Sequence, residues 1–512
     1  MFLYEYNFSI VMGYYNRREQ VSNTLRMFEK YYGPYNFEVI IVDDNSSPEH
    51  RLDDLVNLYT FPVKYIKISS SEKGDRVNPC IPFNRGISCA KGRIVVLQNP
   101  ECYHSSDLLS TIEKTLTQKN YITFSCYMTA NTEVASYLIS NPSLVNDRGF
   151  NIRNIYQGKM AGGVPWSNHP TFRPSNYHFC SAILNDNIKL LGGFDSRFAC
   201  GHSYDDDELL LSIKSNLRID VVCLPPSAGF VIHQWHPRDV GLSHMRREHL
   251  VVRNQHLMDS LKHAHNVSDF KYPKLLHLHF PRLDLLDVST ILSFNRFHKA
   301  WKINIYRLGK CLGNDTLYSE LSSIPNVNIH IIGVSSGYTN ASGELSNTFP
   351  YYIMDRFGGV WSEPDIIYVG SIENYCSSMS DHDAILHRGE GEQSTGLMIA
   401  RKGADTIGKS KTLRADNSNA RVGEDMHNTS PARSSELSIK DTQLYTPFSR
   451  EDVWKIFGMD GKNNFSYEGT DTFGIKWFRD SDEAMQYRKE FNQELSLTGS
   501  CLMKTLLLSY FK

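Results

Sequence analysis

Three apolar runs near the start of the chain each stop abruptly at polar or acidic residues. They are residues 8–12 before Gly13, Tyr14 and Asn16, residues 37–42 before Asp43 and Asp44, and residues 92–98 before Asn99, Pro100 and Glu101. Apolar and β-branched residues predominate in the runs, which predicts strands. Ligands of open α/β sheets bind outside the carboxyl ends of the strands, so the three polar ends are expected to share one crevice.

Helix-like segments separate these strand-like runs. Val21, Leu25 and Phe28 recur at helical spacing after the first run, and residues 84–92 resemble a short helix before the last one. A further strand is expected at residues 63–68. Alternating strands and helices predict the α/β class, with a mainly parallel, Rossmann-like sheet and helices on both of its faces.

The length of the chain indicates more than one domain, because 512 residues exceed what a single core usually supports. A proline followed by a new apolar strand begins at residues 272–279. We therefore place a boundary near residue 270 and expect two α/β domains in tandem, at residues 1–270 and 271–512. Residues 401–440 are polar and low in aromatic residues, which is typical of a flexible loop or a lid.

Composition excludes several classes of protein. The 54 Lys and Arg residues nearly balance the 56 Asp and Glu residues, which argues against a dedicated nucleic-acid binder. Ten cysteines occur without a Cys-x-x-Cys motif, so a disulfide framework or a structural zinc site is not expected. The first residues lack the features of a signal peptide, and no run reaches the ~20 apolar residues of a spanning helix. We expect a cytoplasmic protein, at most peripheral to a membrane.

An acidic run lies at residues 205–208 (Asp-Asp-Asp-Glu), directly before Leu209, Leu210 and Ile213. Acidic groups are favoured in the first turn of a helix, so capping is one explanation of the run. The other explanation is catalysis, since a carboxylate within hydrogen-bond reach can take a proton from an attacking hydroxyl group. The upstream strand ends favour the catalytic explanation.

The motifs of the first half resemble the inverting glycosyltransferases of family 2, which have the GT-A fold. The resemblance covers roughly residues 6–250 and includes residues 84–87 (Asn-Arg-Gly-Ile) and 192–195 (Gly-Gly-Phe-Asp). It implies that Asp44 receives the nucleotide base of a donor sugar and that Asp206, beside Asp205, is the general base. The other residues expected around the donor are Gly13, Tyr14, Asp43, Arg76, Asn84 and Glu101.

The resemblance is incomplete at the strand end that normally carries Asp-x-Asp and a divalent metal. The corresponding residues here are Asn99, Pro100 and Glu101, so one carboxylate is replaced. A single glutamate needs further ligands to hold Mg²⁺ or Mn²⁺. His233 and His236 end a later apolar run and are candidate ligands, because some relatives use a histidine there. A histidine with a purely structural role is the alternative.

An aromatic segment before Gly192 suits an acceptor-binding wall, because aromatic rings contact the C–H faces of sugars. Its candidate residues are Trp166, His169, Tyr177 and His178. Core packing explains the same aromatic residues equally well.

The second half resembles a different group, the family 32-type glycosyltransferases. Residues 357–365 (Phe-Gly-Gly-Val-Trp-Ser-Glu-Pro-Asp) match that family's sugar-binding signature, with departures at Asn347, Pro350 and Lys476. The resemblance implies a donor site at Gly358, Gly359 and Trp361, with Glu363 and Asp365 as metal ligands. Two carboxylates two residues apart at a strand end point to the same side and can share a metal ion.

Together these features predict a bifunctional glycosyltransferase that moves sugars from nucleotide-sugar donors to a glycan acceptor. A divalent cation, Mn²⁺ or Mg²⁺, is expected chiefly in the second domain, since Glu363 and Asp365 form the better pair. Two alternatives stay open. A nucleotidyltransferase also combines strands with acidic ligands, and the missing ligands are compatible with a non-catalytic carbohydrate-binding second domain.

Overall fold

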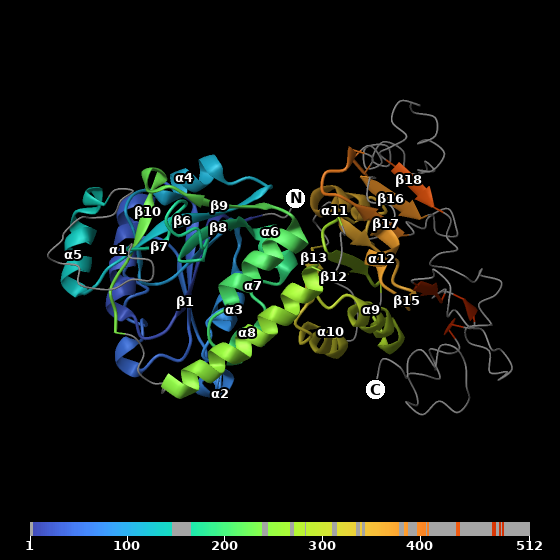
Figure 1. The fold of residues 1–512 in the computed structure, drawn as a ribbon, viewed down its shortest axis with the longest axis horizontal. Helices are drawn as coiled ribbons and strands as arrows, with labels where there is room; N and C mark the ends of the chain where they lie inside the picture. Colours follow the sequence, from blue (N-terminus) through green and yellow to red (C-terminus); the bar gives the residue numbers. More distant parts are fainter. Residues whose placement is uncertain are drawn as a thin grey trace. The chain divides into compact units, whose positions relative to one another are not determined.

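The computed structural model describes residues 4–145, 165–237, 244–266, 271–281, 283–309, 315–333, 338–339, 344–377, 383–387, 397–405, 407–408, 437–440, 474–477, 481–482 and 484–485. The chain divides into two compact units, residues 2–262 and residues 263–512. Figure 1 traces the first unit in blue to green and the second in yellow-green to red. None of the described helices is long and apolar enough to cross a membrane.

The first unit contains one large sheet in the strand order β3-β2-β1-β4-β8-β6-β10-β5, with β7 and β9 paired to β6. Its strands are β1 (Tyr6–Tyr14), β2 (Phe37–Asp43), β3 (Val63–Lys67), β4 (Gly92–Gln98), β5 (Cys102–His104), β6 (Asn120–Met128), β7 (Trp166–Asn168), β8 (Cys180–Leu184), β9 (Asp220–Leu224) and β10 (Phe230–His233). Strands β3, β2, β1 and β4 are parallel, and β8 runs antiparallel to β4.

Helices and short helical turns connect these strands. The helices are α1 (Arg18–Tyr32), α2 (Ser70–Lys73), α3 (Cys80–Cys89), α4 (Leu108–Thr115), α5 (Thr132–Ser140), α6 (Asn185–Leu191), α7 (Asp205–Ser212) and α8 (His244–Asn266). The turns are η1 (Pro48–His50), η2 (Pro142–Leu144), η3 (Ser196–Cys200), η4 (Ile213–Leu217) and η5 (Pro226–Ala228).

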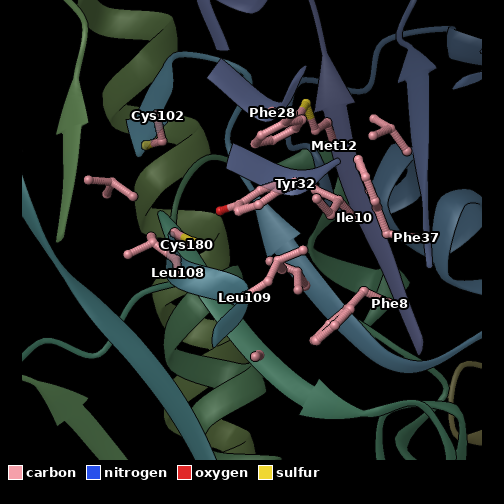
Figure 2. Packing of buried hydrophobic residues seen from close by; sticks show 14 of the residues in the cluster. Phe8, Ile10, Met12, Phe28, Tyr32, Phe37, Cys102, Leu108, Leu109 and Cys180 are labelled. Atoms are coloured by element: carbon pink, nitrogen blue, oxygen red, sulfur yellow. The ribbon is translucent and has the colours of Figure 1, made fainter. Parts of the chain in front are cut away.

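Alternating residues of β1 pack against helices on opposite faces of the sheet, as the period of a strand requires. Phe8, Ile10 and Met12 belong to a core cluster with Phe28 and Tyr32 of α1 (Figure 2). On the other face, α3 approaches β1 closely through Gly86. A Cβ atom there would lie 2.4 Å from Val11 Cγ1, so only glycine allows this packing.

The second unit contains a seven-stranded sheet in the order β13-β12-β11-β14-β17-β16-β18, and β15 pairs with β19. The strands are β11 (Leu275–His279), β12 (Lys302–Leu308), β13 (Val327–Ile332), β14 (Gly359–Trp361), β15 (Ile366–Tyr368), β16 (Ala384–His387), β17 (Leu397–Ala400), β18 (Leu437–Lys440) and β19 (Gly474–Lys476). The helices are α9 (Leu285–Phe297), α10 (Asp315–Ser322), α11 (Phe349–Phe357) and α12 (Ile372–Ser377).

The predicted α/β class with parallel strands and flanking helices is confirmed. Two details differ from the sequence-based expectation. Helix α3 spans Cys80–Cys89 rather than residues 84–92, because Gly92 already pairs with Tyr6 as the first residue of β4. Within the predicted loop at residues 401–440, Leu437–Lys440 form β18, and residues 406 and 409–436 lie outside the described residues.

Candidate active site

The carboxyl ends of β1 and β2 border a cleft of about 990 Å³ in the first unit. Five of the predicted donor residues line it, namely Gly13, Tyr14, Asp44, Arg76 and Glu101. Asn16 and Asn45, which follow these strands, have φ values of 49° and 63°, a left-handed conformation that asparagine tolerates better than most residues. The chain therefore turns sharply just after each of the two strands.

Asp44 offers the cleft a buried carboxylate that is only partly paired. Its Oδ2 lies 3.1 Å from the Nζ atom of Lys73, whereas its Oδ1 is buried without a hydrogen-bond partner among the described residues. Burial raises the pKa of Asp44, and the positive charges of Lys73 and Arg76 oppose that shift. A buried acceptor without a partner is costly in isolation, which suits a ligand that brings an N–H or O–H donor.

Cations surround the same cleft. Its lining includes Arg17, Lys73, Arg76, Arg173, Arg246 and Arg247. Arg76 Nε is buried and has no hydrogen-bond partner in the described part of the chain. An anionic group such as a diphosphate would satisfy this donor and balance the excess of positive charge.

Asp43 and Asn84 were predicted to shape the donor pocket, and in the structure both form hydrogen bonds to neighbouring segments. Asp43 Oδ1 accepts a hydrogen bond of 2.7 Å from the backbone N–H of Ser46, and its Oδ2 accepts one from the Tyr65 hydroxyl. Asn84 exchanges two hydrogen bonds of 2.7 Å with the backbone of Phe194. Neither residue lines the cleft, because each holds a neighbouring loop in place.

Glu101 lies within contact distance of both candidate histidines. The antiparallel pairing of β10 with β5 sets His233 opposite Cys102, next to Glu101 in the chain. Glu101 Oε1 lies 3.2 Å from His233 Nε2 and 3.7 Å from His236 Nε2. Burial disfavours the charged carboxylate, but the two imidazoles outweigh it and hold the pKa of Glu101 well below its ordinary value.

One ligand atom from each of Glu101, His233 and His236 lies within 4.8 Å of the others, close enough to hold one metal ion. The donors fit a transition metal, because imidazole nitrogen and carboxylate oxygen are preferred ligands of Mn²⁺ and Zn²⁺. The sequence-based prediction of these three residues as ligands thus has a matching geometry. His178, Asp205 and Asp206 form a second such group.

The acidic run borders a smaller pocket of about 320 Å³. The two cavities share lining residues, including His202 and Ser203, so the pocket adjoins the cleft. Helix α7 begins at Asp205 after Ser203 and Tyr204, which have φ values of 62° and 69°. Two consecutive left-handed residues other than glycine are strained, and such strain is common beside functional groups.

Asp205 and Asp206 are held by different partners. Asn78 Nδ2 donates to Asp205 Oδ1 at 2.9 Å. Asp206 Oδ1 accepts hydrogen bonds from the backbone N–H and from the ring Nδ1 of His178, at 2.9 and 2.5 Å. Burial, together with the neighbouring charge of Asp206, raises the pKa of Asp205 to about 6.

The four predicted acceptor residues separate into two pairs. Tyr177 and His178 line the acidic pocket. Trp166 is fully buried in a core cluster with Tyr127 and Phe230, so its ring cannot contact an acceptor in this structure. His169 Nδ1 accepts hydrogen bonds from the backbone N–H groups of the turn that follows it, which explains its position.

The predicted donor residues of the second unit are buried near the end of β14. Gly358 accepts a hydrogen bond from His277, and Trp361 is 5% exposed. Glu363 forms an ion pair with Lys476 of β19. Among the described residues, no group of three potential metal ligands includes Glu363 or Asp365.

Sequence reasoning missed two groups that position the site, Lys73 and Asn78. Lys73 ends α2, whose capping box of Ser69 and Glu72 is a recognisable helix signal. That signal predicts a helix, but it does not indicate that the lysine lies beside Asp44.

Residues 9–239, which lie in the first unit, match the model of the family described as Glycosyltransferase like family 2. No curated protein matches the chain. Among solved structures, TarS of S. aureus is 17% identical with a TM-score of 0.31, and the alignment spans 46% of this chain and 37% of TarS.

Two further structures are similar to the chain at the same level. TarS 1–349 of S. aureus in complex with UDP-GlcNAc is 15% identical, with a TM-score of 0.30 and coverage of 46% of this chain and 60% of that one. Glucosyl-3-phosphoglycerate synthase of Mycobacterium tuberculosis, with Mn²⁺, UDP and phosphoglyceric acid, is 13% identical. Its TM-score is 0.32, with 49% of this chain and 78% of that chain covered.

Proposed function

We propose that the first unit is an inverting glycosyltransferase that uses a nucleotide-sugar donor and a hydroxyl-bearing glycan acceptor. The observation that carries the proposal is a pair of adjoining cavities in the first unit, lined mainly by residues of the family 2-like region. One is a cationic cleft in which Asp44 Oδ1 has no hydrogen-bond partner among the residues that the structure describes, and the other is an acidic pocket at Asp206. The sequence after β1 lacks a Gly-rich phosphate loop with a trailing lysine, so the alternative of a nucleotidyltransferase is less well supported.

In the cleft, Asp44 Oδ1 would accept a hydrogen bond from the nucleotide base. The cationic side chains would neutralise the diphosphate, which becomes more negative as the sugar leaves. Interactions that strengthen as this charge develops lower the barrier, whereas uniform binding of the donor does not.

In the pocket, Asp206 would be the general base. His178 donates to Asp206 Oδ1. The Asp206 side chain is 23% exposed, so its Oδ2 is left for the acceptor hydroxyl. The acceptor oxygen forms a bond to the anomeric carbon while the bond from that carbon to the diphosphate oxygen breaks. The electron pair leaves with the diphosphate, and the acceptor proton moves to Asp206 Oδ2.

The residues of the first unit fit a divalent metal, and Glu101, His233 and His236 would hold it. When bound, the ion would supply Lewis-acid stabilisation of the diphosphate oxygens. This assignment reverses the sequence-based ranking, which favoured the second domain. Two imidazoles can replace the missing carboxylate, whereas the ammonium group of Lys476 already neutralises Glu363.

The proposal does not extend to transfer by the second unit. The Lys476–Glu363 ion pair favours the alternative of a carbohydrate-binding or structural unit. Sugar transfer by the second unit would require either that a metal ion displaces Lys476 from Glu363 or that Lys476 itself contacts the donor.

Asp206→Asn tests the proposed function, because the substitution keeps the size of the side chain and removes its basicity. We expect nucleoside diphosphate release to fall by a factor of about 100 to 10,000 while donor binding persists. The measurements are turnover with a panel of nucleotide sugars and acceptors, and thermal shift for donor binding. Asp259→Asn, an exposed change on α8, is the matched control. Normal turnover of Asp206→Asn would disprove the assigned base.

A further inference from the structure

His178 makes two hydrogen bonds to the proposed base, one from its backbone and one from its ring. Both donors, the backbone N–H and the ring Nδ1, point to the same oxygen, Asp206 Oδ1. Two donors on one oxygen fix the rotation of a carboxylate more firmly than one donor does, because both contacts must be lost before the group can turn. The second oxygen is then left for the acceptor side of the pocket.

The ring of His178 is itself held tightly. It is 5% exposed and lies edge-on to Phe83 and Phe194, with ring centroids 4.8 and 4.9 Å away. Both phenylalanines belong to segments that the Asn84–Phe194 hydrogen bonds tie together. The imidazole is therefore a rigid support, and such support determines how precisely a catalytic group is placed.

Charge strengthens the same contact. The charged groups near His178 are Asp205 and Asp206 of α7 and Glu101 before β5, all acidic. Burial lowers the pKa of His178, but the adjacent Asp206 outweighs burial and raises it above its ordinary value. The acceptor of both hydrogen bonds is a carboxylate, and hydrogen bonds to a charged acceptor are stronger than those between neutral groups.

We propose that His178 is a positioning residue for catalysis, which holds Asp206 Oδ1 so that Oδ2 faces the acceptor hydroxyl. This inference rests on the proposed function, since it assumes that Asp206 is the base. It assigns His178 a role other than the acceptor contact expected from the sequence. A purely structural histidine would leave turnover unchanged once the fold is intact, whereas a positioning histidine would not.

Two substitutions separate the ring donor from the bulk of the ring. His178→Leu removes the donor and keeps an apolar side chain between the two phenylalanines. His178→Asn keeps an N–H close to the position of Nδ1. We expect turnover to fall about 10- to 100-fold in His178→Leu, with the KM for the donor unchanged, and to recover to within a few fold of wild type in His178→Asn.

A double-mutant cycle shows whether His178 acts through Asp206. In an Asp206→Asn background, His178→Leu should reduce turnover no further, because the base that it positions is already gone. A full additional loss in that background would overturn the proposal, as would wild-type turnover in His178→Leu. The cycle compares variants in one assay, so it stays informative even if His178→Leu lowers the melting temperature.

Metal binding provides the remaining test, since His178, Asp205 and Asp206 could instead form a metal site. The full chain is titrated with Mn²⁺, and bound ions are counted in wild type and in His178→Asn. An unchanged count supports positioning, and the loss of one ion overturns it. Failure of the proposed function itself is recognised separately, because wild type would then bind no nucleotide sugar from the panel.

Discussion

Two glutamates, Glu101 in the first unit and Glu363 in the second, have side chains of equal exposure but partners of different chemistry. Each side chain is 11% exposed. Glu101 contacts the imidazoles of His233 and His236, whereas Glu363 contacts the ammonium group of Lys476. An imidazole can bind a metal ion together with the carboxylate, whereas an ammonium group competes with the metal for it. The partner of a carboxylate, rather than the number of carboxylates, decides whether the site suits a cation.

The largest expected difference between the two glutamates is in metal affinity. Glu101→Gln should remove the proposed Mn²⁺ site, because it replaces an anionic ligand with an amide, whereas Glu363→Gln should leave that site unchanged. Loss of a ligand is expected to weaken binding by more than the roughly 10- to 100-fold typical of outer-shell changes. Calorimetric titration of the full chain with Mn²⁺ checks this. If Glu101→Gln and Glu363→Gln weaken Mn²⁺ binding equally, the two glutamates do not differ as metal ligands.

Breaking the ion pair of the second unit should have the next largest effect. Lys476→Met leaves Glu363 buried beside an apolar chain, and removal of one partner of a buried pair costs about 3–5 kcal/mol. We expect the unfolding transition of the second unit to move to lower temperature. Glu363→Gln in the same chain should restore much of the loss. Unfolding followed by calorimetry measures both variants, and an unchanged transition would show that the pair is not stabilising.

Acid should destabilise the second unit more than the first. Burial lowers the pKa of His277 to about 3 and of His265 and His298 to about 4, all in the second unit. Among the described buried histidines of the first unit, His104 has a pKa of about 3. In the unfolded chain these histidines bind protons near pH 6.5, whereas in the folded units burial delays their protonation to a pH of about 3 to 4. Stability is therefore lost as the pH falls from about 6.5 towards 4, by about 1.4 kcal/mol per pH unit for each such histidine.

Melting curves at pH values between about 7.5 and 5 test this difference. The Lys476→Met variant identifies which transition belongs to the second unit. The first unit is expected to lose less stability, because the raised pKa of Asp205 favours folding as the pH falls. A steeper loss in the first unit would contradict the expectation.

The smallest predicted effect concerns nucleotide binding. Asp44→Asn replaces one acceptor oxygen by a donor and is expected to weaken donor binding by about tenfold, the cost of one poorly satisfied hydrogen bond. Asp365→Asn is the matched change in the second unit and should leave the dissociation constant unchanged. Fluorescence or calorimetric titration with the donor found in the panel measures both. Weaker binding in Asp365→Asn would assign a donor site to the second unit.

Much of the fold could be predicted from the sequence, because strand ends and helical spacing are local signals. The strand at residues 92–98 has the predicted bounds, and the strand at residues 37–43 extends one residue beyond the predicted run. Asp44, Glu101 and Asp206 line cavities. Short strands such as β5 and β7 were not predicted, because three residues are too few to show a periodic pattern.

The sequence by itself determined the α/β class, the strand ends that meet at the cleft and the position of the acidic run before a helix. Only the tertiary structure decided what each polar group contacts. The pairing of β10 with β5 brings His233 to Glu101, and the folding of the chain brings His178 to Asp206 across 28 residues. The physical reason is that a residue's type and neighbours set its local conformation, whereas its charge, pKa and ligands depend on groups distant in the chain.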